Sequence, residues 1–212
     1  MRRWTNLLDA YTCERIDNCI NQLRQEFAVE QMRDFEVGHL LGRLGRFQTA
    51  ISTDDTVLID AFHVIDDGTE VTLAIFEHQY VQKRHVSRGF VKTEAASALH
   101  ELVLVDLPVG VGRVLIRPET LGDKVSEWFT KREIDFPHEP QFSRRYYVLA
   151  EDDDRARNGL PTRFLQAVGE TDKLVIEIDD TTLAAMKLRP MADNDRSELV
   201  PLALTLRGAW RR

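Results

Sequence analysis

The chain has 212 residues, of which 43% are hydrophobic and 30% charged, and these values exclude wholesale disorder. A chain of this length buries roughly 70% of the surface that it exposes when unfolded, which is enough for a core without disulfides or metals. Its formal charge of −7 argues against a general nucleic-acid-binding surface, because such surfaces are normally basic.

Residues 4–27 carry apolar side chains at helical spacing, and charged residues fill the positions between them. The apolar positions are Trp4, Leu7, Leu8, Tyr11, Ile16, Ile20, Leu23 and Phe27. This pattern predicts one long amphipathic helix, whose apolar stripe is covered either by the chain's own sheet or by a second copy. Gly38, Gly42 and Gly45 then break the helical pattern and lead into β-like sequence.

Residues 46–118 change to the period of two that is typical of strands, and short connections make an antiparallel meander the expected arrangement. The predicted strands are 57–66, 69–81, 99–107 and 113–117, and the last two are joined by a turn at Pro108–Gly112. Asp67-Gly68 is a strong signal for a two-residue hairpin. In that register His63 lies opposite Thr72 and His78 lies opposite Val57.

The rest of the chain alternates between helical and strand-like patterns. We expect a helix over 119–131, a strand over 142–150, a helix from Asp152–Asp154 through Val168, strands at 174–178 and 183–188, and a last helix capped by Ser197. This order predicts an α+β fold. We expect a single domain over 1–212, with a helical subregion (1–45), a β-meander (46–118) and a mixed α/β subregion (119–212).

The two cysteines favour a reducing compartment. Cys13 and Cys19 are six residues apart in the predicted helix, a rise of about 9 Å that is too far for a disulfide. The apolar stretch near the N-terminus is interrupted by Asn6 and Asp9, so it does not fit a signal peptide or a membrane span. The sequence therefore predicts a cytoplasmic location.

The spacing of the candidate ligands in the sequence does not match a metal-binding or cofactor-binding motif. The six histidines are His39, His63, His78, His85, His100 and His138, and none forms a known ligand motif. Gly110-Val111-Gly112 lacks the third glycine of a dinucleotide site and fits a hairpin turn better. We therefore expect no metal, no cofactor and no stoichiometric zinc or calcium in the purified protein.

Three charged segments also have structural explanations. Asp152–Asp154 precede a helix, where carboxylates accept hydrogen bonds from free N–H groups. Arg144–Tyr147 is the best candidate for binding an anion or nucleic acid, but strand alternation would send Arg144 with Tyr146 to one face and Arg145 with Tyr147 to the other. Trp210–Arg212 fits a frayed end better than a contact with acidic lipid.

Residues 85–180 resemble a bacterial domain family of unknown function. The resemblance rests on Ile134–Phe136, on the strand-like segment Pro140–Asp152 and on Leu160–Leu165; Leu104–Pro108 and Arg117–Glu119 also fit its pattern. Many members look membrane-anchored through hydrophobic N-terminal helices, whereas the N-terminal helix expected here is amphipathic and too charged to span. The resemblance implies a fold and no activity.

No nucleophile elbow of the form G-x-S-x-G is present, and the sequence leaves the catalytic residues, if any, unknown. We expect a cytoplasmic, non-enzymatic binding or scaffold module that exists as a monomer or weak homodimer. Its partner would be a protein or a small molecule and not nucleic acid, with peripheral membrane contact open. The alternative is a small-molecule enzyme, of a hydrolase-like kind, whose site is assembled from residues distant in sequence.

Overall fold

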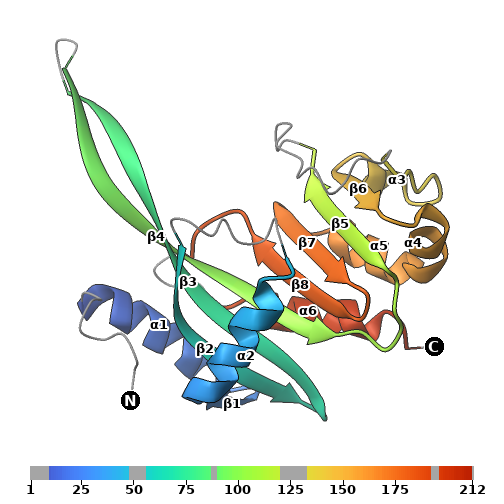
Figure 1. The fold of residues 1–212 in the computed structure, drawn as a ribbon, viewed down its shortest axis with the longest axis horizontal. Coiled ribbons are helices and arrows are strands. Elements are labelled where there is room, and N and C mark those ends of the chain that lie inside the picture. Colours follow the sequence, from blue (N-terminus) through green and yellow to red (C-terminus); the bar gives the residue numbers. More distant parts are fainter. Residues whose placement is uncertain (1–9, 48–55, 87–89, 120–132, 192–195, 212) are drawn as a thin grey trace.

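A single antiparallel sheet forms the centre of the computed structural model (Figure 1). The structure describes residues 10–47, 56–86, 90–119, 133–191 and 196–211. At 81–86 and 90–95 it describes the backbone alone. The eight strands follow the order β1-β2-β3-β4-β8-β7-β5-β6. They are β1 (Ala28–Gln31), β2 (Thr56–Asp66), β3 (Thr69–Val86), β4 (Phe90–Asp106), β5 (Arg113–Pro118), β6 (Tyr146–Ala150), β7 (Leu174–Asp179) and β8 (Thr182–Lys187).

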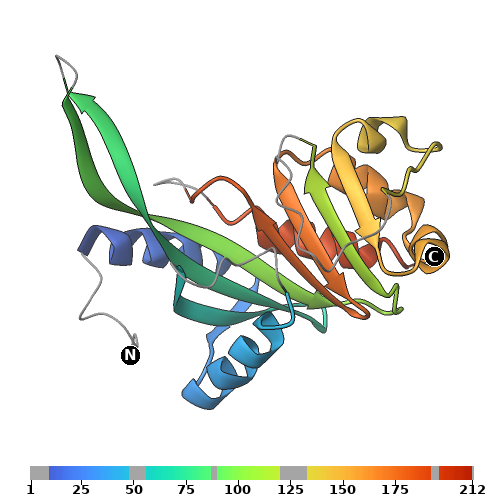
Figure 2. The same cartoon turned by 45° about the horizontal axis from the view of Figure 1, so that its top comes forward.

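Helices cover both faces of this sheet unequally. They are α1 (Ala10–Leu23), α2 (Asp34–Leu44), α3 (Pro140–Ser143), α4 (Asp153–Gly159), α5 (Thr162–Gly169) and α6 (Leu199–Gly208). In Figure 2, α1 and α6 lie behind the sheet and α2 lies in front of it. The α+β class, with an N-terminal helix, then strands, then alternating helices and strands, is therefore confirmed. Among the described residues, no helix combines the length and apolar character needed to cross a membrane.

The larger core lies on the face that α1 and α6 cover. Ile16, Ile20 and Leu23 of α1 are buried in it, and Leu23 is only 1% exposed. The chain's own sheet therefore covers this part of the stripe, whereas Tyr11, nearer the start of α1, remains 53% exposed. The helix is shorter than expected, because α1 ends at Leu23 and Phe27 packs on the core from beyond its end. The predicted part at 4–9 lies outside the described residues.

The second face is covered by α2, a helix that the sequence pattern did not predict. Gly38 and Gly42, expected to end the helical pattern, lie inside it. Each glycine costs a helix about 1 kcal/mol relative to alanine. Leu40 and Leu44 offset that cost because they are buried against the sheet. The first turn is further stabilised by Glu36, which accepts hydrogen bonds from the Arg33 backbone and guanidinium.

The hairpin at Asp67-Gly68 has the predicted register near the turn. Asp66 pairs with Thr69 and His63 pairs with Thr72. Asp67 has a φ of 42° and Gly68 a φ of 71°, which are the positive values that a type I′ turn requires at both central positions. The expected cluster on one face is also confirmed, and it comprises Phe62, Val64, Val71 and Leu73.

Farther from the turn, the predicted register is wrong by one residue. A β-bulge interrupts the pairing between Leu58 and Asp60, so His78 lies opposite Thr56 instead of Val57. A bulge places two residues of one strand against one of its partner, and every pair beyond it shifts. Single-strand periodicity carries no signal for this insertion.

The expected hairpin between β4 and β5 does not form. The β7–β8 hairpin is inserted between them: β4 pairs with β8, and β5 pairs with β7 and β6. The connection 107–112 crosses the turn of that hairpin, with Leu107 N–H donating to the Thr181 carbonyl and Val111 N–H donating to the Asp180 carbonyl. A short connection thus spans three strand spacings, about 14 Å, instead of reversing the chain into the neighbouring strand.

The C-terminal third needs further corrections. The strand expected over 142–150 begins only at Tyr146, after the one-turn helix α3, and the helix expected through Val168 is split at Leu160-Pro161 into α4 and α5. Ser197 does not cap α6: the N-cap position is Glu198, and the Ser197 hydroxyl is buried without a hydrogen-bond partner. The hairpin of 174–178 with 183–188 is confirmed as β7–β8. The helix expected over 119–131 lies outside the described residues, apart from Glu119.

We predict that Gly68→Val lowers the free energy of unfolding by about 1–3 kcal/mol, because a β-branched residue is strained at positive φ. A Cβ at Gly68 would meet nothing within 4 Å, so the loss would come from the backbone alone. Urea unfolding measures it, and Gly68→Asn is the matched control because asparagine tolerates the left-handed region. Equal stability of the two variants would contradict the turn.

We predict that Leu23→Asp destabilises the protein by about 3 kcal/mol, because it places an unpaired carboxylate in the larger core. Asn21→Asp introduces the same charge on the exposed side of α1 and should change the unfolding free energy by less than about 0.5 kcal/mol. Chemical unfolding of both variants tests this expectation. A stable Leu23→Asp protein would show that α1 is dispensable for the fold.

Candidate docking surface

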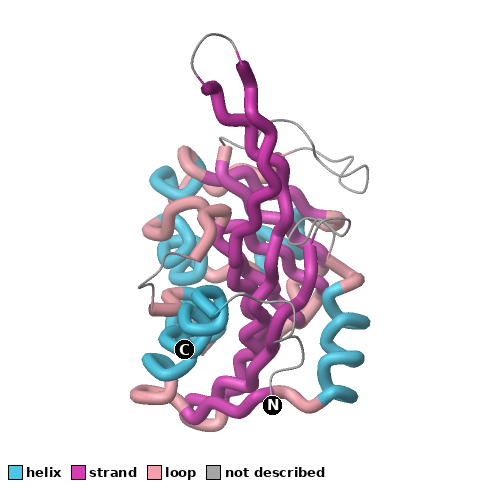
Figure 3. Tube along the Cα trace, turned by 90° about the vertical axis from the view of Figure 1, so that its left-hand side faces the viewer, coloured by secondary structure: helices cyan, strands magenta, loops and turns pink. Residues whose placement is uncertain are grey.

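The most distinctive surface of the molecule is a two-stranded arm that projects from the sheet (Figure 1 and Figure 3). We define the arm as Gln79–Val86 of β3 and Phe90–Ser97 of β4, which pair with each other. The pairing of β2 with β3 ends at His78, and the pairing of β8 with β4 begins at Leu102. Eight residues at 3.3 Å each give the arm a length of about 26 Å.

Sequence patterning missed most of the arm. The predicted strands ended at 81 and resumed at 99, whereas β3 and β4 continue to the tip. Gln79 and Tyr80, at the start of the arm, are exposed, and Tyr80 keeps 42% of its surface accessible. The available signals in the sequence were the β-branched and aromatic residues within 80–91 and the basic residues Lys83, Arg84 and Lys92.

The root of the arm carries an aromatic group on the face that α2 also covers. The His78 ring stacks on Tyr80, with centroids 6.1 Å apart, and meets His100 edge-on at 6.3 Å. Thr56 Oγ1 lies 3.4 Å from His78 Nδ1. These rings lie next to the buried Phe76 at the margin of the second core cluster.

His100 is the most perturbed histidine of this group. Burial lowers its pKa from the usual 6.5, and the charge of a protonated His78 lowers it further, while a hydrogen bond to the Lys187 backbone acts in the opposite direction. Its Nδ1 atom is buried and has no hydrogen-bond partner among the described residues. Folding therefore favours the neutral imidazole of His100 relative to the unfolded chain.

A small charged pocket lies beside the root, where the segment after β8 crosses β4. The Met191 N–H donates to the Leu99 carbonyl at 2.8 Å. The pocket, about 20 Å³ in volume, is lined by Glu101, Lys187, Arg189, Pro190, Met191, Arg196, Glu198 and Leu199. Lys187 and Arg189 both pair with Glu198, and Arg196 pairs with Glu26. A second pocket of about 70 Å³ lies between α1 and the sheet, next to Asp17 and Asp60.

The remaining histidines are dispersed over the fold. His63 lies 2.7 Å from Glu70 through Nδ1 and 3.8 Å from Glu36 through Nε2, whereas His39 is exposed on α2 and His138 packs edge-on against Phe136. The His85 side chain lies outside the described side chains. Across the described residues, no group of three or more acidic, histidine or cysteine side chains is placed to hold a metal ion. Neither cysteine forms a disulfide, as expected, and Cys19 Sγ lies 3.3 Å from Glu101 Oε1.

The glycines at 110 and 112 have a structural role where the chain crosses the β7–β8 turn. A Cβ at Gly110 would come within 2.4 Å of Asp180 Oδ1, and Gly112 has a φ of 81°. The Asp180 N–H donates to the Gly112 carbonyl. The G-x-G sequence therefore permits a close crossing of two chain segments. The simple hairpin turn expected there does not form.

The acidic run has the structural role that was expected of it. Asp152 is the N-cap of α4, and its Oδ1 accepts a hydrogen bond of 2.9 Å from the Arg155 N–H. Asp153 and Asp154 lie in the first turn, where their charge favours the positive end of the helix dipole.

The Arg144–Tyr147 tract does not form a binding face. Arg144 is the C-cap of α3 and not part of a strand, which corrects the predicted alternation. Arg145 binds Asp172 and the Gly169 carbonyl, and the buried Tyr146 donates to the Thr171 carbonyl. Both side chains thus fix the α5–β7 connection to β6. The central carbon of the Arg117 guanidinium lies 5.8 Å from the centroid of the Tyr147 ring.

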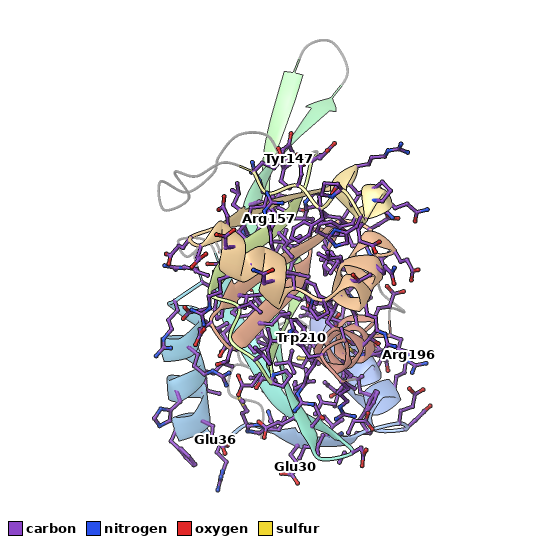
Figure 4. The ribbon with its side chains drawn as sticks, turned by 90° about the vertical axis from the view of Figure 1, so that its right-hand side faces the viewer. Glu30, Glu36, Tyr147, Arg157, Arg196 and Trp210 are labelled. Atoms are coloured by element: carbon purple, nitrogen blue, oxygen red, sulfur yellow. The ribbon has the colours of Figure 1, made fainter. Side chains whose placement is uncertain are left out.

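Trp210 is anchored and not frayed, which corrects the expectation for this end of the chain. Its Nε1 donates to the Gly159 carbonyl at 2.9 Å, and its ring lies 5.2 Å from that of Phe164. Figure 4 labels Trp210 among the side chains of the helical layer. This partly buried tryptophan therefore packs on the larger core and is tied to the end of α4.

No family model and no curated protein sequence matches this chain. One solved structure, the crystal structure of the mycobacterial trehalose monomycolate transport factor A, TtfA, is similar in fold. The TM-score is 0.52 at 11% sequence identity, and the match covers 94% of this chain and 92% of that one. At this identity the likeness concerns the fold.

We predict that the protein loses stability as the pH falls through the ordinary histidine pKa of about 6.5. His100 has a lowered pKa in the folded state, so below that pH the unfolded chain binds the proton more readily and is favoured. Replacing His100 by glutamine should flatten the dependence, measured by urea unfolding at about pH 7.5 and about pH 5.5. His39→Gln, on the exposed side of α2, should keep the slope of the original protein. An unchanged slope in His100→Gln would contradict the assignment.

Proposed function

We propose that this protein is a non-enzymatic binding module that docks on another macromolecular surface through its arm. The observation that carries the proposal is the pairing pattern: beyond His78, β3 and β4 pair with each other and project from the sheet. Ordering a residue costs about 1–2 kcal/mol of backbone entropy, and an isolated two-stranded ribbon is marginal in water. A partner that contacts the arm would supply the missing stabilisation.

Pocket size supports binding over small-molecule catalysis. The two pockets described above measure about 20 and about 70 Å³, whereas ligand sites usually measure about 300–1,000 Å³. The pocket beside the root has its charges largely paired, through Lys187, Arg189 and Glu198. Such a surface fits a structural support for the arm better than an active site.

The fold likeness supports the same class of function. The similar structure is that of a protein described as a transport factor, a role that does not require catalysis. For this chain we propose a binding role and not a particular cargo. We also propose a bacterial source, which the resemblance at residues 85–180 implies. We also propose a cytoplasmic location and a monomer or weak homodimer, which the reduced thiols of Cys13 and Cys19 support.

Site-specific photo-crosslinking in the source cells tests this function. Benzoylphenylalanine placed at Tyr80, at the root of the arm, should yield an adduct of one reproducible mass. The matched control is Tyr11 of α1, which is 53% exposed against 42% for Tyr80 and should yield none. Excess unmodified protein should compete for the Tyr80 adduct. Equal adducts at both positions would overturn the proposal, and so would the absence of an adduct at Tyr80 in a protein that also does not sediment with the membranes of those cells.

A protein with a shortened arm provides a second test. Tyr80 and Ala96 are register partners, so residues 81–95 can be replaced by an Asn-Gly turn that continues the existing pairing. This protein should keep its melting temperature within about 4 °C, because the replaced residues project beyond the sheet. It should fail to compete for the Tyr80 adduct. Competition as strong as that of the full protein would show that the arm is not the docking element.

A further inference from the structure

We propose that the arm docks on an anionic lipid bilayer, an inference that rests on the proposed function and names its partner. The observation is a separation of charge along the chain. The arm contains three basic residues (Lys83, Arg84 and Lys92) and one acidic residue (Glu94), a net charge of +2, so the rest of the chain carries −9. An arm of about 26 Å exceeds the Debye length of about 8 Å at physiological salt. The acidic body therefore does not cancel the attraction of the arm for an anion.

The register places like charges opposite one another. Arg84 is paired with Lys92, and Lys83 adjoins this pair. Like charges directly opposite in an antiparallel ribbon are destabilising, and a two-stranded ribbon has little stability to spare. This arrangement works against the fold of the isolated arm and becomes favourable when an anionic surface neutralises it.

The order of residues toward the tip matches a bilayer. The last register pair of the arm, Val86 with Phe90, is apolar, and the pair Arg84 with Lys92 lies two residues behind it. Two residues correspond to about 7 Å, similar to the depth of about 5–10 Å at which interfacial segments bury apolar side chains beneath the headgroups. Apolar residues at the end and basic residues one step behind would thus meet acyl chains and phosphates in turn. Nucleic acid would use the basic residues but gives the apolar end no comparable environment.

Vesicle co-sedimentation of the full-length protein tests the inference. The protein should bind vesicles that contain phosphatidylglycerol and should not bind vesicles of phosphatidylcholine alone. Because each basic residue near an anionic surface contributes about fivefold, the double variant Arg84→Gln/Lys92→Gln should partition about 30-fold less. The matched control is Arg144→Gln/Arg163→Gln, which removes two exposed arginines of the body and should bind as the unmodified protein does.

Two further measurements separate the possible outcomes. Phe90→Ser should weaken vesicle binding about equally at low and high salt, whereas the charge variant should reduce the salt dependence. Competition with an oligonucleotide identifies a nucleic-acid partner: tight oligonucleotide binding without vesicle binding would overturn the inference. So would equal binding to both vesicle types, or unchanged binding by Arg84→Gln/Lys92→Gln.

Failure of the lipid inference can be distinguished from failure of the proposed function. If vesicles do not bind but the Tyr80 crosslink is specific, the arm docks on a protein and only the lipid inference is wrong. Should the arm variants fold poorly, the unmodified protein still decides the matter, because lipid attraction through the arm requires vesicle binding that weakens steeply as sodium chloride is raised. Salt-insensitive binding would overturn it.

Discussion

The pairing of β3 with β4 is the constraint on which the rest of the structure depends. These strands are in register over sixteen residue pairs, yet β4 contacts β8 over only five. The inner half of the ladder builds the centre of the sheet and contributes Leu73 and Val103 to the larger core. The outer half has no third strand among the described residues. One continuous ladder therefore serves both as the core of the body and as the support of the arm.

The two faces of the sheet are covered to different extents. The face under α1 and α6 is continuous from β2 to β6, whereas α2 covers only the part near β2, β3 and β4. Toward β5 and β7 the second face contains the fully buried Glu177, whose carboxylate lies 3.9 Å from Arg113. Arg113 also donates to the Arg46 carbonyl, just after α2. This polar contact ties the end of α2 to the second half of the sheet.

Sequence reasoning succeeded where one face of an element packs on the core and failed elsewhere. The turn at Asp67-Gly68 and the hairpin of β7 with β8 were predictable because hydrophobic alternation and turn residues agree there. The helix α2 was missed because Gly38 and Gly42 lie on the side turned away from the sheet, where tertiary burial of other positions overrides propensity. The insertion of β7–β8 between β4 and β5 is a long-range pairing, and local patterns do not encode it.

The candidate surface was harder to predict than the fold, for the same physical reason. The pairing of Gln79–Val86 with Phe90–Ser97 continues an existing ladder and is not set by a hydrophobic period, so the predicted strands ended at 81 and resumed at 99. Several of the motifs that the sequence brought forward make structural contacts. Gly110 and Gly112 permit a close crossing, Asp152 caps a helix, and Arg145 ties two elements together.

The edges of the sheet show how a basic arm can persist without aggregating. At one side of the body the edge strand β1 has only four residues, and at the other the Ile134 N–H donates to Val148 of β6 at 2.8 Å. Short or covered edges limit pairing between copies. The arm has neither protection in the part of the chain that the structure describes. Its residues Lys83, Arg84 and Lys92 have charges of the same sign, and like charges oppose pairing between two copies. The lipid docking proposed above would use this same set of basic residues.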